Sequence, residues 1–461
     1  MAKRALSKFV VVANRLPVNR KGRGASARWE MSPGGLVSAL TPILQARDGA
    51  WVGWGGSTGA PQKPFTHEGI QNHPLSLSRD AYEKYYEGYS NSTLWPLYHD
   101  AVRPPQYHRK WWYSYEKVNR AFAERTAEVA GKGAIVWVQD YHLHLVPGIL
   151  RELRPDLRIG FFLHIPFPPQ ELFAQLPWRT RMIMGTLGAD VVGFQTRQGA
   201  QNFSRLARRL TAWEGTDSLL KHDGRAVKVR DFPISIDVAR FRDVAARDAT
   251  LNKAEKIRRD LGGRRIILGI DRLDYTKGID LRLRAFRELL ESGRTSIDEA
   301  VLVQTAVPSR EHVGMYKQIR TTVEQLVGEI NGAHARVGKT AVHYLFKNLP
   351  IEDLVALYLA ADIMLVTPYR DGMNLIAKEY IASKVWNDGV LILSEFTGAA
   401  NELKQALLIN PHDLDGLADA IHTALNMPLD ERQARMKPMR KHIAANDVYH
   451  WADSFIEAME A

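Results

Sequence analysis

The chain has 461 residues, of which 45% are hydrophobic and 25% charged, which indicates a globular protein of about two or three domains. Its formal net charge of +11 favours anionic partners, but basic residues alternate with Asp and Glu, which argues against nucleic-acid binding. No apolar run approaches the ~20 residues of a membrane span. The run at 9–13 is too short for a signal peptide, so we expect a cytoplasmic protein. The absence of cysteine excludes disulfides and thiol nucleophiles.

Short apolar runs recur along the chain with helical patterns between them. They lie at 9–13, 134–138, 158–163, 190–195, 265–270, 300–305, 341–346, 362–367 and 390–393. Runs without polar alternation are typical of strands buried on both faces, and helices between them imply parallel sheets with right-handed crossovers. The strands are too many for one ordinary sheet. We therefore expect an α/β protein with two doubly wound, Rossmann-like domains.

The segment 231–237 contains Phe232-Pro233 and leads into a new charged helical stretch, so it is the expected domain boundary. It would separate residues 1–234 from residues 235–444. The last helix, within 445–461, carries Trp451 and Phe455 four residues apart, which predicts that it docks on another element.

Polar residues follow several of the predicted strands directly. They are Arg15, Asp140, His164, Arg272, Arg310 and Asp371. Ligands of open α/β sheets bind outside the carboxyl ends of the strands, so these positions are predicted to converge on one cleft.

Arg272 and Lys277 lie in a loop between a strand and a helix start. Two cations beside a helix N-terminus would bind a diphosphate, and a loop closed by salt bridges with Asp271 and Asp274 is the alternative. The turn 369–375 is a second anion-binding candidate. Gly372 permits close backbone approach there, and the amides of Met373, Asn374 and Leu375 can face an anion.

Three further features are open to two interpretations. Glu379 would accept from sugar hydroxyls or be a solvated helix residue, and Gly34-Gly35 would place amides against a ligand or mark a turn. The aromatic stretch 82–98, with Tyr86 and Trp95, suits sugar binding or a core.

Eight collinear segments together resemble the retaining trehalose-6-phosphate synthases. They are NRLP (14–17), GGL (34–36), YYEGYSNSTLWP (85–96), QDYHL (139–143), GFFLHIPFP (160–168), DRLDYTKG (271–278), VPSRE (307–311) and DGMNLIAKEY (371–380). The resemblance covers nearly the whole chain. It implies the glycosyltransferase-B fold, in which two Rossmann-like domains face each other across a cleft and the C-terminal helix completes the N-terminal domain.

The resemblance also implies substrates and residue roles. Residues 1–234 would bind glucose 6-phosphate through Arg15, Tyr86, Trp95, Asp140 and Arg310. Residues 235–444 would bind a nucleotide-diphosphate glucose, with Phe346 at the base and Glu379 at the ribose. The donor set is completed by Gly34, Gly35, His164, Arg272, Lys277, Asp371, Gly372, Met373, Asn374 and Leu375. Asp140, His164, Arg272 and Lys277 would act in catalysis.

The expected reaction is glucosyl transfer with retention, giving α,α-trehalose 6-phosphate. Because the matching set offers no second carboxylate as a nucleophile, a front-face mechanism is favoured over the two-carboxylate mechanism of glycoside hydrolases. Neither a metal nor a cofactor is required. The donor base and the assembly of copies into a homo-oligomer stay open.

Two other readings of the resemblance stay open as well. A related transferase would use another acceptor, giving glucosylglycerol phosphate or a coupled pseudo-sugar. A catalytically silent regulator would bind sugar phosphates without turning them over, although Arg15, Arg272, Lys277 and Arg310 are all present.

Overall fold

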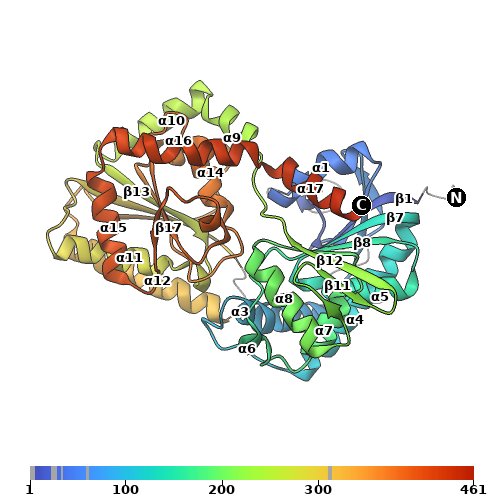
Figure 1. The fold of residues 1–461 in the computed structure, drawn as a ribbon. Coiled ribbons are helices and arrows are strands. Elements are labelled where there is room, and N and C mark those ends of the chain that lie inside the picture. Colours follow the sequence, from blue (N-terminus) through green and yellow to red (C-terminus); the bar gives the residue numbers. More distant parts are fainter. Residues whose placement is uncertain (1–5, 22–27, 33–34, 59–61, 310–313) are drawn as a thin grey trace. The chain divides into compact units, whose positions relative to one another are not determined.

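The computed structural model describes residues 6–21, 28–32, 35–58, 62–309 and 314–461. The chain divides into two compact units, the first of residues 1–234 with 449–461 and the second of residues 235–448 (Figure 1). Each unit is built on a mainly parallel sheet with helices between the strands, which confirms the predicted pair of doubly wound α/β domains. None of the helices described is long and apolar enough to cross a membrane.

The second unit has six parallel strands in the order β15-β14-β13-β16-β17-β18. Their bounds are β13 (Arg265–Arg272), β14 (Ala300–Val307), β15 (Val342–Phe346), β16 (Ile363–Val366), β17 (Val390–Ser394) and β18 (Leu407–Ile409). The chain winds outward from β13 to β15, then returns to the other side of β13 and winds outward again. The reversal between β13 and β16 is the place where doubly wound sheets bind ligands.

The helices of this unit form two layers. They are α9 (Val238–Ala245), α10 (Asp248–Asp260), α11 (Ile279–Glu291), α12 (Gly314–His334), α13 (Ile351–Ala360), α14 (Leu375–Ser383), α15 (Leu414–Asn426) and α16 (Leu429–Ala445). Helices α11, α12 and α15 pack together in one layer, while α10 packs on α13, and α14 on α16, in the other (Figure 1).

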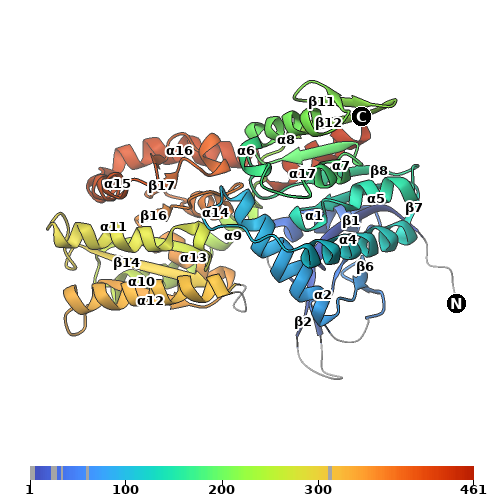
Figure 2. The ribbon, with the colours of Figure 1, turned by 90° about the horizontal axis from the view of Figure 1, so that it is seen from below.

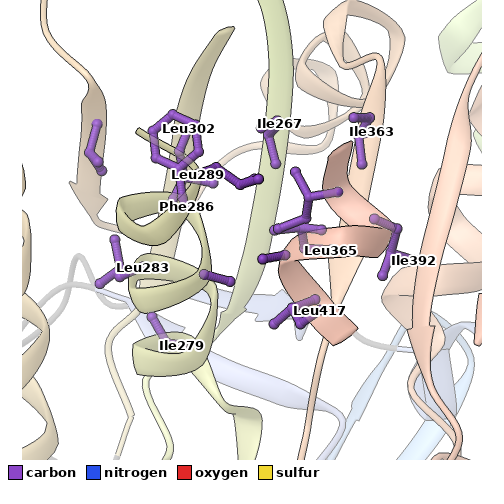
Figure 3. Packing of buried hydrophobic residues seen from close by; sticks show 14 of the residues in the cluster. Ile267, Ile279, Leu283, Phe286, Leu289, Leu302, Ile363, Leu365, Ile392 and Leu417 are labelled. Carbon is purple, nitrogen blue, oxygen red and sulfur yellow. The ribbon is translucent and has the colours of Figure 1, made fainter. Parts of the chain in front are cut away.

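A continuous apolar core joins the sheet of the second unit to one helix layer. Figure 3 shows Phe286 and Leu289 of α11 close to Leu302 of β14 and Ile267 of β13, and all four side chains are buried. The strands lack polar alternation because helices cover both of their faces.

The first unit has a ten-stranded sheet in the order β10-β11-β12-β9-β8-β7-β1-β4-β6-β5, antiparallel only toward its two edges. Its strands are β1 (Ser7–Arg15), β4 (Ala50–Trp54), β5 (Phe65–His67), β6 (Ile70–Leu75), β7 (Ala130–Gln139), β8 (Arg158–Phe162), β9 (Val191–Phe194), β10 (Glu214–Gly215), β11 (Leu219–His222) and β12 (Arg225–Asp231). A separate hairpin pairs β2 (Val18–Lys21) with β3 (Arg28–Met31).

The helical segments of the first unit connect these strands. They are α1 (Gly35–Ala46), α2 (Arg79–Ala81), the π-helix η2 (Tyr82–Leu94), α3 (Trp95–Tyr98), α4 (Arg109–Val129), the 3₁₀-helix η3 (Tyr141–Leu143), α5 (Val146–Leu153), α6 (Gln170–Phe173), α7 (Arg179–Thr186), α8 (Arg197–Leu210) and α17 (Val448–Glu460).

Helix α17, from the far end of the chain, packs on the sheet of the first unit (Figures 1 and 2). Phe455 stacks on Trp137 of β7 at 4.4 Å between ring centroids. A Cβ added to Gly160 of β8 or Gly193 of β9 would lie 2.6 or 2.5 Å from the Phe455 ring. The two glycines therefore leave the space that this helix fills.

The returning segment begins at Tyr449, not at residue 445 as the sequence suggested. Helix α16 runs to Ala445, and the Val448 amide still donates to the Ile236 carbonyl of the second unit at 3.0 Å. That hydrogen bond keeps the chain with the second unit for three more residues.

Two inner strands of the first unit, β4 and β6, were not among the predicted strands. Strand β4 pairs with both β1 and β6. Its sequence AWVGW is short and interrupted by glycine, and β6 contains Asn72, His73 and Pro74, so neither gives a clear apolar run.

Candidate active site

The predicted donor residues that belong to the second unit lie at the carboxyl edge of its sheet, whereas Gly34, Gly35 and His164 belong to the first unit. Arg272 is the exposed last residue of β13, and Phe346 is the half-buried last residue of β15. The turn 369–375 follows β16 and leads into α14. Because the strands are parallel, their ends meet at one edge.

The 3₁₀-helix η4 (Tyr275–Lys277) carries Lys277 to the turn after β16. The Lys277 Nζ lies 2.6 Å from the Asp371 Oδ2, and the two side chains are only 9% and 13% exposed. The Asn374 Nδ2 donates to the same oxygen at 3.0 Å. The structure therefore joins three of the predicted donor residues in one buried polar cluster.

The turn before α14 has an unusual backbone. Asn374 adopts a left-handed conformation with φ of 77°, and its side-chain oxygen accepts from the Ala377 amide at 3.3 Å, which caps the helix. Helix α14 begins at Leu375, so the turn of Gly372 and Met373 lies at the positive end of the helix dipole. An anion is stabilised at such a helix end.

Arg282 of α11 supports this edge from within the core. Its side chain is fully buried and pairs with Asp271 of β13. It also donates to the Thr367 Oγ1 at 2.8 Å and to the Lys277 carbonyl at 3.2 Å. Burial raises the pKa of Asp271, and the guanidinium opposes that rise. Arg282 thus ties the end of β13, η4 and the end of β16 together.

The predicted alternative is a loop closed by salt bridges with Asp271 and Asp274, but the ion pair of Lys277 is with Asp371. Asp271 pairs with Arg282. Asp274 accepts from the Thr276 hydroxyl at 2.9 Å and from the Tyr316 hydroxyl at 2.9 Å. Both carboxylates shape the loop, and Lys277 turns instead to Asp371.

Glu379 lies one helical turn into α14 and is not a solvated residue. The buried Tyr358 of α13 donates its hydroxyl hydrogen to the Glu379 Oε2 at 2.8 Å. Burial raises the pKa of Glu379, while this hydrogen bond lowers it. A carboxylate oriented in this way is suited to accept from ligand hydroxyls.

Phe346 is covered on one face by a cation. The Arg320 guanidinium of α12 lies 4.2 Å above the centroid of the Phe346 ring, a cation–π distance. Phe346 is the predicted base-contacting residue, so Arg320 belongs to the same surface.

In the first unit, Arg15 ends β1 beside an aromatic ring. Its guanidinium lies 4.7 Å from the ring centroid of Trp54, at the end of β4. A Cβ on Gly56 would lie 2.8 Å from the same guanidinium, and Gly56 has φ of +87°. A glycine is therefore needed for Arg15 to take this position.

Tyr86 belongs to a stack of rings on η2. Its ring is stacked on His142 at 5.7 Å and tilted toward Trp54 at 6.2 Å. Trp95 is buried between His99 and Tyr141, with centroids 4.2 and 5.7 Å away. Arg15 and Tyr86 thus share Trp54 as a neighbour, whereas Trp95 lies in the aromatic core beside them.

Asp140 and His164 follow neighbouring strands, β7 and β8, and are hydrogen-bonded. The His164 amide donates to the Asp140 Oδ1 at 3.2 Å, and Asp140 has φ of 74°. The His164 Nε2 lies 2.8 Å from the Gln139 Oε1, and burial lowers the pKa of His164 to about 3. The imidazole is therefore neutral at physiological pH. Trp451 of α17 lies 6.1 Å from its ring.

Two predicted site residues, Gly34 and Arg310, lie outside the described residues, and Gly35 is the first residue of α1. Within the described ranges, no three His, Asp or Glu side chains cluster in a way that could hold a metal ion.

Several residues of this region were not predicted as site residues from the sequence. Arg282, Tyr358, Arg320, Trp54 and Gly56 all contact predicted site residues. Each is distant in sequence from the residue it contacts or sits inside an ordinary helix or strand pattern. Only the long π-helix η2 had a local signal, its excess of aromatic residues, because π-helical segments often mark functional sites.

Two Rossmann-like domains, with cations beside a helix N-terminus in the second, are features of the glycosyltransferase-B class of enzyme, and solved structures of this class match the chain over nearly its whole length. The model of glycosyltransferase family 20 matches residues 7–461, so the chain belongs to this family.

Curated and solved relatives agree with this assignment. The chain is 53% identical over 99% of its length, and 93% of the other, to a protein of Mycolicibacterium smegmatis named trehalose-6-phosphate synthase. A structure of an α,α-trehalose-phosphate synthase (UDP-forming) from Burkholderia xenovorans in complex with glucose-6-phosphate matches with a TM-score of 0.90 at 34% identity, covering 98% of this chain and 100% of the other. A structure described as trehalose-6-phosphate from E. coli bound with UDP-2-fluoro glucose matches with a TM-score of 0.91 at 35% identity, covering 98% and 99%.

Proposed function

We propose that the chain transfers glucose from a nucleotide-diphosphate glucose to glucose 6-phosphate, giving α,α-trehalose 6-phosphate and a nucleoside diphosphate. The observation that carries this proposal is the Lys277–Asp371–Asn374 cluster at the N-terminus of α14. It offers a cation and helix amides to a diphosphate, in a chain whose curated relatives are named for this synthesis.

In the donor half, Arg272 and Lys277 stabilise the diphosphate as it leaves. Asp371, Gly372, Met373, Asn374 and Leu375 hold the glucose and the phosphates, Glu379 accepts from the ribose, and Phe346 contacts the base. Gly34 and Gly35 complete the donor set. Charge stabilisation of a leaving group by fixed cations is often the largest catalytic term.

In the acceptor half, Arg15 and Arg310 bind the phosphate of glucose 6-phosphate, and Tyr86 and Trp95 bind its sugar ring. Asp140 orients the acceptor hydroxyl. His164 is neutral and hydrogen-bonded to Gln139, so it acts on the donor sugar as a hydrogen-bonding group.

The transfer retains the anomeric configuration through a front-face reaction. The bond from C1 of glucose to the phosphate oxygen breaks while the bond from C1 to the acceptor 1-hydroxyl oxygen forms on the same face. The acceptor proton passes to the departing phosphate oxygen. No metal or cofactor takes part, since the two cations neutralise the diphosphate.

Product analysis tests the proposal. The protein is incubated with glucose 6-phosphate and, separately, uridine, guanosine or adenosine diphosphate glucose, with and without a chelator. We expect nucleoside diphosphate release and an α,α-1,1-linked product by NMR, unchanged by the chelator, and the preferred donor identifies the base. Release only with another acceptor, such as glycerol 3-phosphate, would assign a related transferase. Binding without release for every pair would assign a silent regulator.

A further inference from the structure

The second unit has a cavity of about 740 Å³ at the amino edge of its sheet. Arg265, the first residue of β13, lines it, as do Asp362 directly before β16 and Asp388 just before β17. Arg272 lies at the other end of β13, about 23 Å away at the usual rise of a strand. The cavity is therefore separate from the candidate donor site.

The wall of this cavity groups three arginines around one carboxylate. Three arginines surround the Asp362 Oδ1, with guanidinium nitrogens 3.0, 3.6 and 4.0 Å away for Arg265, Arg258 and Arg432. At this carboxylate, one negative charge faces three guanidiniums.

The other two carboxylates of the wall are already paired with cations. Asp388 lies 2.9 Å from the Nζ of the buried Lys384, and Glu255 lies 3.6 Å from Arg259. These pairs draw part of the charge of Asp388 and Glu255 away from the arginines, although Asp388 still attracts Arg432.

The three arginine side chains differ in how far they are exposed to solvent. The Arg432 side chain is 7% exposed, whereas those of Arg258 and Arg265 are 38% and 46% exposed. Burial lowers the pKa of Arg432, and the neighbouring Arg265 adds to that effect. A bound anion would relieve this crowding of like charges.

The same cavity has an apolar rim. Trp386 is 54% exposed and Leu429 is 55% exposed, although both are large hydrophobic side chains, and both line the cavity. An exposed ring and cations that line one cavity suit a ligand that joins a planar group to an anionic group. The volume is within the usual range of small-molecule sites.

We propose that this cavity binds a small phosphate monoester with a planar ring, of the size of a nucleoside monophosphate. A phosphate monoester carries close to two negative charges at neutral pH and can therefore pair with two guanidiniums. The phosphate would bind Arg258 and Arg265, since guanidiniums bind phosphate oxygens in pairs. The ring would pack on Trp386.

Calorimetric titration with adenosine monophosphate tests the proposal. It is carried out on the Arg272→Ala/Lys277→Ala variant, whose donor site has lost its diphosphate cations. We expect one molecule bound per chain, and a loss of affinity of at least about tenfold when Arg265→Gln is added, the usual order for removing a charged hydrogen-bond donor. Lys256→Gln removes a charge from α10 outside the cavity and is expected to leave the affinity unchanged.

Further variants and ligands in the same titration distinguish ligand binding from a structural role of the arginines. Trp386→Ala changes an exposed side chain, so the fold should persist while affinity for adenosine monophosphate falls severalfold and affinity for inorganic phosphate stays the same. Adenosine alone should bind weakly. Absence of binding in the Arg272→Ala/Lys277→Ala variant, or binding that Arg265→Gln and Trp386→Ala both leave intact, would overturn the proposal and leave the arginines as a link between α10, α16 and β16.

Discussion

Arg272 ends β13 with an exposed guanidinium, whereas Lys277 is buried against Asp371. The two cations therefore have different tasks in the proposed reaction. Lys277 is already held in place by its carboxylate, while the exposed Arg272 can be removed without leaving a cavity in the core.

We expect Arg272→Ala to lower kcat by about two to three orders of magnitude, because one fixed charge on the leaving group is lost. Steady-state kinetics with saturating donor would measure this loss. Arg284→Ala, which removes an exposed arginine from α11, serves as the control for net charge. A kcat within twofold of the unsubstituted protein would contradict the role of Arg272.

Tyr358 contacts the site through its hydrogen bond to Glu379. In Tyr358→Phe the half-buried Glu379 carboxylate loses its hydroxyl partner, so we expect the donor KM to rise about tenfold, as for loss of a charged hydrogen bond, with little change in kcat. Tyr380→Phe is the matched control, because that hydroxyl donates to the Asp362 carbonyl instead. Equal donor KM values for the two variants would show that Tyr358 does not position Glu379.

His144 is a buried histidine whose titration affects the stability of the first unit. Its ring nitrogens contact the Tyr98 hydroxyl at 3.1 Å and the Thr186 hydroxyl at 2.9 Å, and burial lowers its pKa to about 3. In the unfolded chain the pKa of histidine is about 6.5, so between these values the unfolded state binds more protons. The stability that comes from keeping His144 neutral is therefore fully present above about pH 6.5 and is lost as the pH falls.

The expected loss for this histidine is about 2 kcal/mol at pH 5 relative to pH 8. Urea unfolding of the first unit at both pH values would measure it. In His144→Gln the difference between the two pH values should shrink by this amount, even if the variant is less stable at both. If His144→Gln left the difference between pH 5 and pH 8 unchanged, His144 would be protonated at pH 5 in the folded state as it is in the unfolded chain.

At the scale of an element, η4 depends on the conformation of Gly278. This residue has φ of +61°, and a Cβ on it would lie 2.2 Å from the Thr367 carbonyl oxygen. Gly293, after α11, has φ of +70° but nothing within 4 Å of such a Cβ. An alanine at position 293 would therefore introduce backbone strain alone, whereas an alanine at position 278 would introduce backbone strain and a steric clash.

We expect Gly293→Ala to cost about 1 kcal/mol of stability, the strain of a left-handed alanine. Gly278→Ala should cost more and should also weaken nucleoside diphosphate binding, because the clash displaces Lys277. Urea unfolding and calorimetry on both variants would compare them. Similar losses of stability with intact binding in both would contradict this role of Gly278.

The sequence predicts strands well where they are unbroken runs of aliphatic residues, and poorly where other residue types form a buried strand. Strands β13 and β16 are apolar on both faces, so a short window identifies them. Strand β4 is equally buried, but its Trp and Gly residues interrupt the aliphatic run by which a buried strand is recognised. The π-helix η2 depends on hydrogen bonds one residue longer than those of an α-helix, and residue patterns do not encode that choice.

The same limit applies to the site. Strand ends point to Arg15, Asp140, His164 and Arg272, because topology alone puts such residues at one edge of a sheet. The pairing of Lys277 with Asp371 joins residues 94 apart in sequence, and only the folded chain determines it. The supporting Arg282 looks like any basic helix residue until its burial is known.

At the scale of the whole molecule, the chain passes between its units twice, after Ile234 and before Tyr449. The second passage returns α17 to the first sheet, where Trp451 lies 6.1 Å from the ring of His164. The last residues of the chain therefore support a predicted catalytic residue of the first unit, and the first unit cannot complete its core until they have docked.

This arrangement predicts that one substitution in α17 acts on the first unit only. Phe455 is fully buried and stacks on Trp137, so Phe455→Ala should destabilise that unit by about 3–5 kcal/mol, the usual cost of emptying a large aromatic site. Phe286→Ala empties an equally buried site in the second unit.

Urea unfolding, with nucleoside diphosphate binding as the readout of the second unit, would separate the two effects. Phe455→Ala should lose structure at lower urea while binding persists, and Phe286→Ala should lose binding first. If both variants lost structure and binding in one shared transition, the two units would fold as one body, and the terminal helix would stabilise the whole chain.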